Sequence, residues 1–168
     1  MLELIANNLV NIIRAITVAA GVALGWIILN AVFGGTQIND LETMAQAMQL
    51  AYQGQSYQYG SAVIPDSVLI GTGKVDSSVI TGGNTINTRW QTPIVWTGAG
   101  NNFTASLSGV PYNDCTAIVE DSGLANYIQT YAVGSNTAAA GPFDPPTAST
   151  QCGTSGTTTI TITFTGHP

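Results

Sequence analysis

The sequence predicts an α+β protein in which a long N-terminal helix is joined to a β-rich head. Residues 15–29 form a run without a single charge, and apolar residues recur at helical spacing over residues 36–52. Threonine alternates with apolar residues over 157–165, which is the period of a strand with one buried face. We therefore expect a helix over residues 1–52 and a globular head over residues 53–168.

The N-terminal segment has the composition of a membrane helix. Its apolar block over residues 15–33 is close to the roughly 20 residues that cross a bilayer, with Asn30 as the only clearly polar interruption. A signal peptide is the alternative, but it would have a basic start and a small-residue cleavage site. This segment instead carries Glu3 and continues into a helical pattern. We expect a membrane-compatible part over residues 1–35 and an amphipathic part over residues 36–52.

Glycines divide this helix into regions of different character. Gly21 and Gly25 are four residues apart among alanines, which lets helices approach closely in an apolar setting. Gly34 and Gly35 are expected to loosen the helix before its amphipathic part begins.

Composition and charge exclude a role in direct nucleic-acid binding. The chain has three basic and nine acidic residues and a net charge of −6, so no basic stripe can neutralise phosphates. Charged residues are only 7% of the chain, against about 25% in typical soluble domains. Uncharged polar residues supply the polarity, which suits a protein that packs against copies of itself or faces the outside of a cell.

The residue types for catalysis or metal binding are missing from the sequence. The only histidine is His167, so no Ser-His-Asp or Cys-His arrangement and no four-ligand zinc site can be assembled. The segment 71–74 has the Gly-x-Gly-Lys letters of a phosphate loop but lacks the full pattern. The carboxylates occur singly or as neighbours that we interpret as solvated helix faces: Asp40 with Glu42, and Glu120 with Asp121. We expect no enzyme and no cofactor.

Two cysteines favour a disulfide. Cys115 and Cys152 stand 37 positions apart and neither belongs to a Cys-x-x-Cys motif. A bridge between them implies an oxidising compartment and would contribute on the order of 3–4 kcal/mol in the chain-entropy model. Two buried free thiols are the alternative.

Alternation and turn residues predict the elements in the first part of the head. Residues 67–71 read as a helical turn. A strand is expected over residues 89–97, with Pro93 suggesting a sheet edge, and a second strand over residues 102–110. The segment 98–102 between them reads as a hairpin loop.

The second part of the head is predicted to contain one helix, a loop and a closing strand. The helix should begin around Pro111, which suits a first turn, and end by Gly123. Residues 134–157 are rich in Gly, Pro, Ser and Thr and read as a long loop before the strand over residues 157–165.

Five stretches, taken in their order along the chain, resemble one protein family. They are Ala-Gly-Val at 20–22, the helix exit at 50–57, Leu-Ile-Gly-Thr-Gly-Lys-Val at 69–75, Ile-Asn-Thr-Arg-Trp at 86–90, and the strand, Val-Pro and helix at 107–119. The chain resembles class B type IV pilins, as found in toxin-coregulated, bundle-forming and conjugative thin pili.

The resemblance implies a fold and a role for the chain. The second half of the long helix would pack on an antiparallel sheet, Cys115 would pair with Cys152, and Met1 would be the processed, methylated N-terminus. The first half would lie in the inner membrane before assembly and in the filament core afterwards. The residues expected to pack in that core are Ala20, Gly21, Val22, Gly25 and Trp26.

As a partner, the resemblance implies other copies of the same chain. A major pilin polymerises into an extracellular filament with the help of an assembly machinery, and the filament serves adhesion, motility or conjugative DNA transfer. The subunit itself is expected to bind no nucleic acid.

The sequence departs from the family near its N-terminus. The family carries a glutamate there, but that position falls on Asn7 if residues 20–22 set the alignment, and Glu3 is two residues early if Met1 sets it. Glu3 and Arg14 are about 16 Å apart along one helix, so we predict that they pair between neighbouring subunits. The alternative is that Arg14 extends to a lipid headgroup or to solvent.

Two other functions compete with that of a major pilin. A minor pilin or a pseudopilin of a secretion or conjugation machine would share the fold. A membrane-anchored, β-rich binding ectodomain would instead expose an aromatic patch. Its candidate residues are Trp90, Trp96, Tyr127 and Tyr131, although core positions fit them better.

Overall fold

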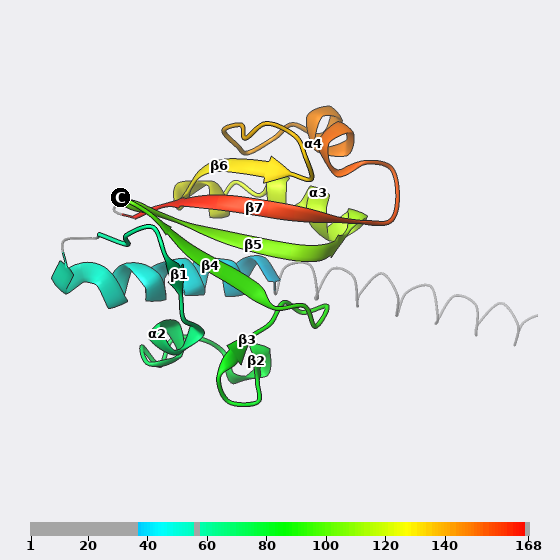
Figure 1. Cartoon of the computed structure of the whole chain (residues 1–168). Helices are drawn as coiled ribbons and strands as arrows, with labels where there is room; N and C mark the ends of the chain where they lie inside the picture. The colour runs from blue at the N-terminus through cyan, green and yellow to red at the C-terminus, as the bar shows by residue number, and fades with distance from the viewer. Residues whose placement is uncertain (1–36, 56–57, 167–168) are drawn as a thin grey trace, which may run out of the picture. The chain divides into compact units, whose positions relative to one another are not determined.

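The computed structural model describes residues 37–55 and 58–166, and the expectations for residues 1–35 lie outside this part. Residues Thr36–Pro168 form one compact unit. In it, a helix over residues 37–52 lies along an antiparallel sheet, and smaller elements flank it on both sides (Figure 1). No helix in the described residues is long and apolar enough to cross a membrane.

The helix over residues 37–52 is amphipathic, as predicted. Four of its buried apolar residues recur at spacings of three and four and form the stripe toward the sheet: Leu41, Met44, Ala45 and Met48. They belong to the same core as the inward-facing residues of the sheet. The apolar stripe therefore holds the helix to the sheet, and the hydrophobic effect supplies most of the stabilisation.

Five strands form the main sheet in the order β1-β4-β5-β7-β6, and all neighbours are antiparallel. The strands are β1 (Val63–Ile64), β4 (Ile94–Ala99), β5 (Asn102–Pro111), β6 (Ile128–Val133) and β7 (Thr157–Thr165). A two-stranded sheet, β2 (Ile80–Thr81) with β3 (Thr85–Ile86), lies beside it. The closing strand, β7, has the bounds that the threonine alternation predicts.

Short helices connect the strands. They are α2 (Asp66–Ile70), α3 (Tyr112–Glu120) and α4 (Pro145–Cys152), with 3-10 turns η1 (Gln53–Gln55), η2 (Ser77–Val79) and η3 (Leu124–Asn126). The predicted helical turn at residues 67–71 is α2. In Figure 1, α2 and the β2–β3 pair lie on one flank of the helix over residues 37–52, and α3 and α4 lie toward the other.

Aromatic residues fill the centre of the core. Trp96, Phe103 and Phe164 are fully buried. Phe103 and Phe164 face each other across β5 and β7, and their rings stack with centroids 5.1 Å apart. Such a pair contributes about 0.5–1.5 kcal/mol beyond the burial of its area.

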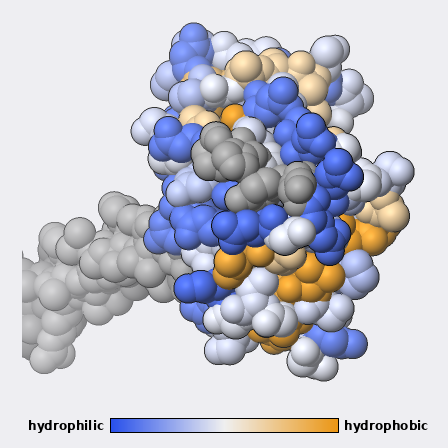
Figure 2. Space-filling model, turned by 90° about the vertical axis from the view of Figure 1, so that its left-hand side faces the viewer, coloured by the Kyte–Doolittle hydropathy of each residue, from blue (hydrophilic) through white to orange (hydrophobic). Residues whose placement is uncertain are grey.

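The described surface is mostly polar, with few large apolar side chains. Figure 2 shows one end of the head, where hydrophilic residues form a band across the middle and hydrophobic residues are most prominent below it. Three large hydrophobic residues are exposed in the described part of the chain: Leu50, Val63 and Val95.

The hairpin between β4 and β5 is tighter than the predicted loop over residues 98–102. Ala99 pairs with Asn102, so only two residues form the turn. Gly100 has φ 67°, which matches a type II′ turn with glycine at its first position. Gly98 has a different role, because a Cβ there would overlap the Tyr59 carbonyl where the chain crosses β4.

The prediction for the first strand is wrong in two respects. The strand begins at Ile94 rather than at residue 89, because residues 88–92 form a tight turn closed by Thr88 and Thr92. It is also not an edge strand, since β1 and β5 flank it. Pro93 lies just before β4, so its missing backbone N–H removes no hydrogen bond from the sheet.

The predicted helix after Pro111 is shorter than expected. α3 ends at Glu120, and Asp121 adopts an extended conformation. The Asp121 carboxylate accepts a hydrogen bond from the Leu124 backbone N–H at 2.7 Å. A local turn therefore replaces the last helical residues before Gly123.

The predicted loop over residues 134–157 contains α4. Asp144 accepts a hydrogen bond from the Thr147 backbone N–H at 2.8 Å, and two prolines occupy the first helical positions. An N-terminal capping residue followed by proline is a helix-start signal. Strand β6, which contains Tyr131, was not predicted from the sequence.

Candidate functional site

Arg89 joins the first described turn of the helix over residues 37–52 to the head. Its guanidinium Nε donates to Asp40 Oδ2 at 2.6 Å, and its Nη2 donates to Asp40 Oδ1 at 3.0 Å. Its backbone N–H donates to Gln37 Oε1 at 2.7 Å. The side chains of Gln37 and Asp40 lie one helical turn apart, so a single residue of the head holds the whole turn.

This ion pair is largely withdrawn from water. The Asp40 side chain is 8% exposed and the Arg89 side chain 22% exposed. The hydrogen bonds with Asp40 raise the pKa of Arg89 above its usual value. Burial and two-point geometry make the pair far more specific than a surface ion pair.

The predicted solvated face at Asp40 and Glu42 is therefore wrong for Asp40. Asp40 is buried because its partner Arg89, 49 positions later in the chain, returns to the helix through the turn before β4. Sequence spacing along the helix contains no signal for this partner.

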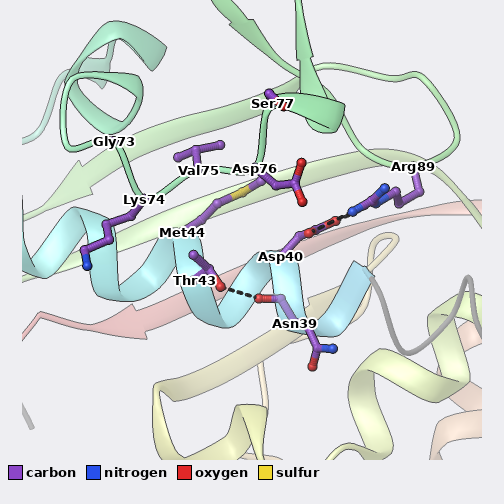
Figure 3. Close-up of a pocket in the computed structure, with 10 residues that line it drawn as sticks. All are labelled: Asn39, Asp40, Thr43, Met44, Gly73, Lys74, Val75, Asp76, Ser77 and Arg89. Atoms are coloured by element: carbon purple, nitrogen blue, oxygen red, sulfur yellow. Dashed lines mark hydrogen bonds and ion pairs between the residues drawn. The ribbon is translucent and has the colours of Figure 1, made fainter.

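A groove of about 600 Å³ opens beside the ion pair (Figure 3). The helix forms one wall with Asn39, Asp40, Thr43 and Met44, and residues 73–77 with Arg89 form the other. In Figure 3, Lys74 and Arg89 lie toward opposite ends, and the Asp76 carboxylate lies between them. The groove thus contains equal numbers of acidic and basic groups.

The acidic group on the second wall also has a structural task. Asp76 Oδ1 accepts a hydrogen bond from the Ser78 backbone N–H at 2.7 Å, which caps η2. This hydrogen bond lowers the pKa of Asp76. Its charge also acts on Arg89, so the carboxylates of Asp76 and Asp40 both favour the charged guanidinium.

The groove has the chemistry of a structural junction. Both oxygens of Asp40 are taken by Arg89, and no histidine lies in the groove to serve as a base. Within the described residues, no three His, Cys, Asp or Glu side chains converge on a possible metal position. What the arrangement can do is hold a helix to a loop.

A disulfide forms a second junction, as the cysteine pattern and the resemblance predict. Cys115 of α3 is bonded to Cys152 of α4, with their Cα atoms 5.9 Å apart. Both cysteines are buried, and Tyr112 Oη lies 3.3 Å from Ser149 Oγ between the same two helices. The bridge anchors α4, which lies in a segment rich in Gly, Pro and Thr.

The aromatic patch that a binding ectodomain would expose does not form, and the four candidate residues lie in or against the core, as expected. Trp96 and Tyr131 are fully buried in the core, and Trp90 and Tyr127 are partly buried. Trp90 Nε1 donates to the Ser108 carbonyl, and the Tyr127 hydroxyl accepts from Gln46. These contacts leave no shared aromatic surface for a ligand.

The predicted core-packing residues, the glycine pair, the Glu3–Arg14 pair and the processed Met1 all lie outside the described residues. Conversely, the Gln37–Asp40–Arg89 junction was not predicted from the sequence. An unusual feature could have pointed to it, because Arg89 is one of only three basic residues in the chain.

The model of the family described as "PilS N terminal" matches residues 34–165. The chain belongs to the PilS N-terminal family. A type IVb pilin from Salmonella typhi has a similar crystal structure, with 20% sequence identity and a TM-score of 0.59 over 76% of this chain and 97% of that one. TcpA, a type IV pilin from the El Tor biotype of Vibrio cholerae, matches with 11% identity and a TM-score of 0.48 over 76% and 98%. No curated protein sequence matches.

The type IVb pilin resemblance is therefore confirmed. The Salmonella structure shows that the chain has the α+β pilin fold, with its helix on an antiparallel five-stranded sheet and a disulfide-bonded loop. Pilins are structural rather than enzymatic proteins. The Gln37–Asp40–Arg89 junction and the disulfide are thus structural features of a pilin head.

Proposed function

We propose that this pilin is a major structural subunit that polymerises into a type IV pilus. The observation that supports this most is the family match over residues 34–165, immediately preceded by the apolar run over residues 15–33. A head of this fold joined to an uncharged segment that suits both lipid and helix packing has the two parts that a filament subunit needs.

The apolar segment has two successive partners in this proposal. Residues 1–35 lie in the inner membrane before assembly and in the filament core afterwards. Ala20, Gly21 and Gly25 let neighbouring helices approach closely, and Gly34 with Gly35 loosens the chain before the head. The pilus assembly machinery moves the subunit from one setting to the other, and the filament is extracellular.

The two charges near the N-terminus are proposed to pair between subunits. A charge within an apolar core is costly unless an opposite charge meets it, and Glu3 and Arg14 are too far apart to meet within one helix. Neighbouring subunits staggered along the filament can bring them together. A filament structure in which they are more than about 6 Å apart in all neighbours would contradict this pairing.

In this proposal, the filament forms because each subunit contacts the next one through two different surfaces, and the same contact is repeated along the polymer. A head-to-tail contact that does not close on itself produces an open helical polymer. The net charge of −6 opposes close approach of the heads, so the uncharged apolar segment has to provide the attraction.

Removal of residues 1–28 tests the proposal. The truncated chain should be soluble and monomeric in analytical ultracentrifugation, and electron microscopy should show filaments only for the full chain. A truncated chain that still polymerises would rule out residues 1–28 as the filament core.

A further inference from the structure

A short segment extends the main sheet beyond β6. In Figure 1, the chain between β6 and α4 lies beyond β6, on the side away from β7. There, Tyr131 and Ala139 exchange both backbone hydrogen bonds, each 2.8 Å long. Successive residues of an extended segment direct their backbone groups to opposite sides. Since Ala139 bonds to β6, its neighbours Ala138 and Ala140 direct their backbone groups away from the sheet.

These outward groups form a free sheet edge, residues 138–140, which we call the open edge. Neither Ala138 nor Ala140 makes a backbone hydrogen bond with any residue that the structure describes, and both are exposed. The open edge thus offers two N–H and two C=O groups to a further strand. Proteins commonly protect such an edge with a charge or a proline, and residues 134–141 contain neither.

The residues that follow the open edge fix it to β6. Gly141 lies so close to Tyr131 that a Cβ there would overlap the aromatic ring. Phe143 packs edge-on against the same ring, with centroids 5.6 Å apart. The position of the open edge is therefore set by the core of the head. A partner strand that pairs with it has to order little of this chain, which favours binding.

Three carboxylates lie near the C-terminal end of the open edge. Asp144 directly follows Phe143 in the chain, and the Phe143 backbone N–H donates to the Val119 carbonyl at 2.8 Å. Glu120 and Asp121 directly follow Val119. The hydrogen bond between the two segments therefore brings these acidic residues to the same end of the open edge.

No basic side chain from the second half of the head balances these carboxylates. Residues 90–166 contain no lysine, arginine or histidine. Burial, and after it the charge of Asp121, raise the pKa of Tyr131, so the field of this carboxylate reaches β6. A cation placed at this end of the open edge is attracted by a charge that nothing nearby neutralises.

We propose that the open edge binds an extended peptide segment of another protein that carries lysine or arginine. The peptide adds one strand to the sheet through main-chain hydrogen bonds with Ala138 and Ala140. Its cation lies beside the three carboxylates. In this mode of recognition, main-chain pairing supplies the affinity and the side chains supply the specificity.

A peptide from another protein fits the open edge better than a second copy of this chain. The basic residues of the described chain are Lys74 and Arg89, and Arg89 is already bonded to Asp40. A second copy could bring only Lys74, a single cation in the short connection between α2 and η2. Few main-chain hydrogen bonds are available, so the partner has to contribute charge as well.

The test uses synthetic peptides and the isotope-labelled full chain in detergent. The basic peptide is Lys-Thr-Val-Thr-Val-Thr-Lys, and the acidic peptide has glutamate in place of both lysines. NMR measures hydrogen exchange of single backbone amides. In about 1 mM basic peptide, exchange at Ala138 and Ala140 should slow about threefold or more, which corresponds to a Kd of about 0.5 mM or tighter. The acidic peptide should leave both rates unchanged, and Ala139, already bonded, should not respond to either.

Two controls separate strand addition from simple attraction between charges. A basic peptide with every backbone nitrogen methylated keeps both lysines but donates no main-chain hydrogen bond, so it should not slow the exchange. Ala140→Pro removes one outward N–H of the chain and should weaken binding about fivefold or more, measured at Ala138. Ala140→Ser keeps this N–H and should bind like the parent.

Three results would overturn the proposal. The first is a basic peptide that slows exchange at neither Ala138 nor Ala140. The second is equal binding of the acidic or the methylated peptide, since charge or strand pairing would then be irrelevant. The third is slow exchange at both residues without any peptide that is lost on dilution, since a second copy would then occupy the open edge.

The peptide comparison on the parent chain decides the matter even if Ala140→Pro does not fold. All measurements use the unassembled chain. A failure of peptide binding would therefore leave the proposed polymerisation untouched, and a failure to polymerise would not affect this test.

Discussion

Arg89 and Asp40 form a two-point ion pair, with Nε–Oδ2 and Nη2–Oδ1 distances of 2.6 and 3.0 Å, between the turn before β4 and the helix over residues 37–52. The pair lies at the end of the helix nearest to the apolar segment in the sequence. In a polymer built through that segment, this pair would hold the helix to the head under tension.

Asp40→Asn should lower the free energy of unfolding by about 2–4 kcal/mol, because it leaves the Arg89 guanidinium largely buried without its charge partner. Glu42→Gln removes the same charge from the same helix at a position that makes no ion pair with any residue the structure describes. It should change the free energy of unfolding by less than about 0.5 kcal/mol. Urea unfolding of the detergent-solubilised chain, followed by tryptophan fluorescence, measures both. Equal effects of the two variants would show that the pair contributes nothing specific.

Replacing both cysteines with serine should lower the free energy of unfolding by about 3–4 kcal/mol, because the bridge closes a long loop in the unfolded chain. The same urea experiment with and without reductant checks this value. Reductant should destabilise the parent chain and leave the double-serine variant unchanged. A parent chain insensitive to full reduction would contradict the role of the bridge.

Gln91→Gly should stabilise the head by roughly 0.5 kcal/mol. Gln91 has φ 66° in the turn before β4, a conformation that costs a residue with a Cβ about 1 kcal/mol and costs glycine little. The greater freedom of glycine in the unfolded chain offsets part of this gain. Gln58→Gly, at an exposed residue without positive φ, should be neutral or destabilising. A higher thermal midpoint for Gln91→Gly alone is the expected result.

Asp144→Ala should lower the thermal midpoint at neutral pH, because the cap of α4 is lost. The hydrogen bonds with Thr147 lower the pKa of Asp144 in the folded chain. Its stabilising effect is therefore complete above the usual aspartate pKa and disappears as the pH falls through the lower, folded value. As the pH is lowered from about 5 to strongly acidic values, the thermal midpoint of the parent should fall toward that of the variant. A difference that persists below both pKa values would contradict this titration.

Local patterns in the sequence predicted the regular elements well. The alternation in β7 and the helical spacing over residues 37–52 each reflect one buried face, which a single segment encodes by itself. The α4 helix was encoded too, since Asp144 and the two following prolines are a start signal, but its Gly-, Ser- and Thr-rich surroundings obscured it.

Contacts between distant segments were harder to predict. Asp40 resembles any solvated helix carboxylate until Arg89 is placed beside it, and only the tertiary fold does that. The start of β4 was misplaced for a similar reason, because hydrogen bonds between Thr88 and Thr92 create a turn where alternation suggests a strand. The disulfide was predictable because the chain has only two cysteines.

Electron microscopy of material sheared from cells that express the full chain and an assembly machinery tests the polymerisation most directly. The structure and sequence predict filaments that bind an antibody raised against the head along their whole length. Cells in which the antibody finds the chain only in the membrane fraction, with no labelled filament, would contradict the assignment as a major pilin.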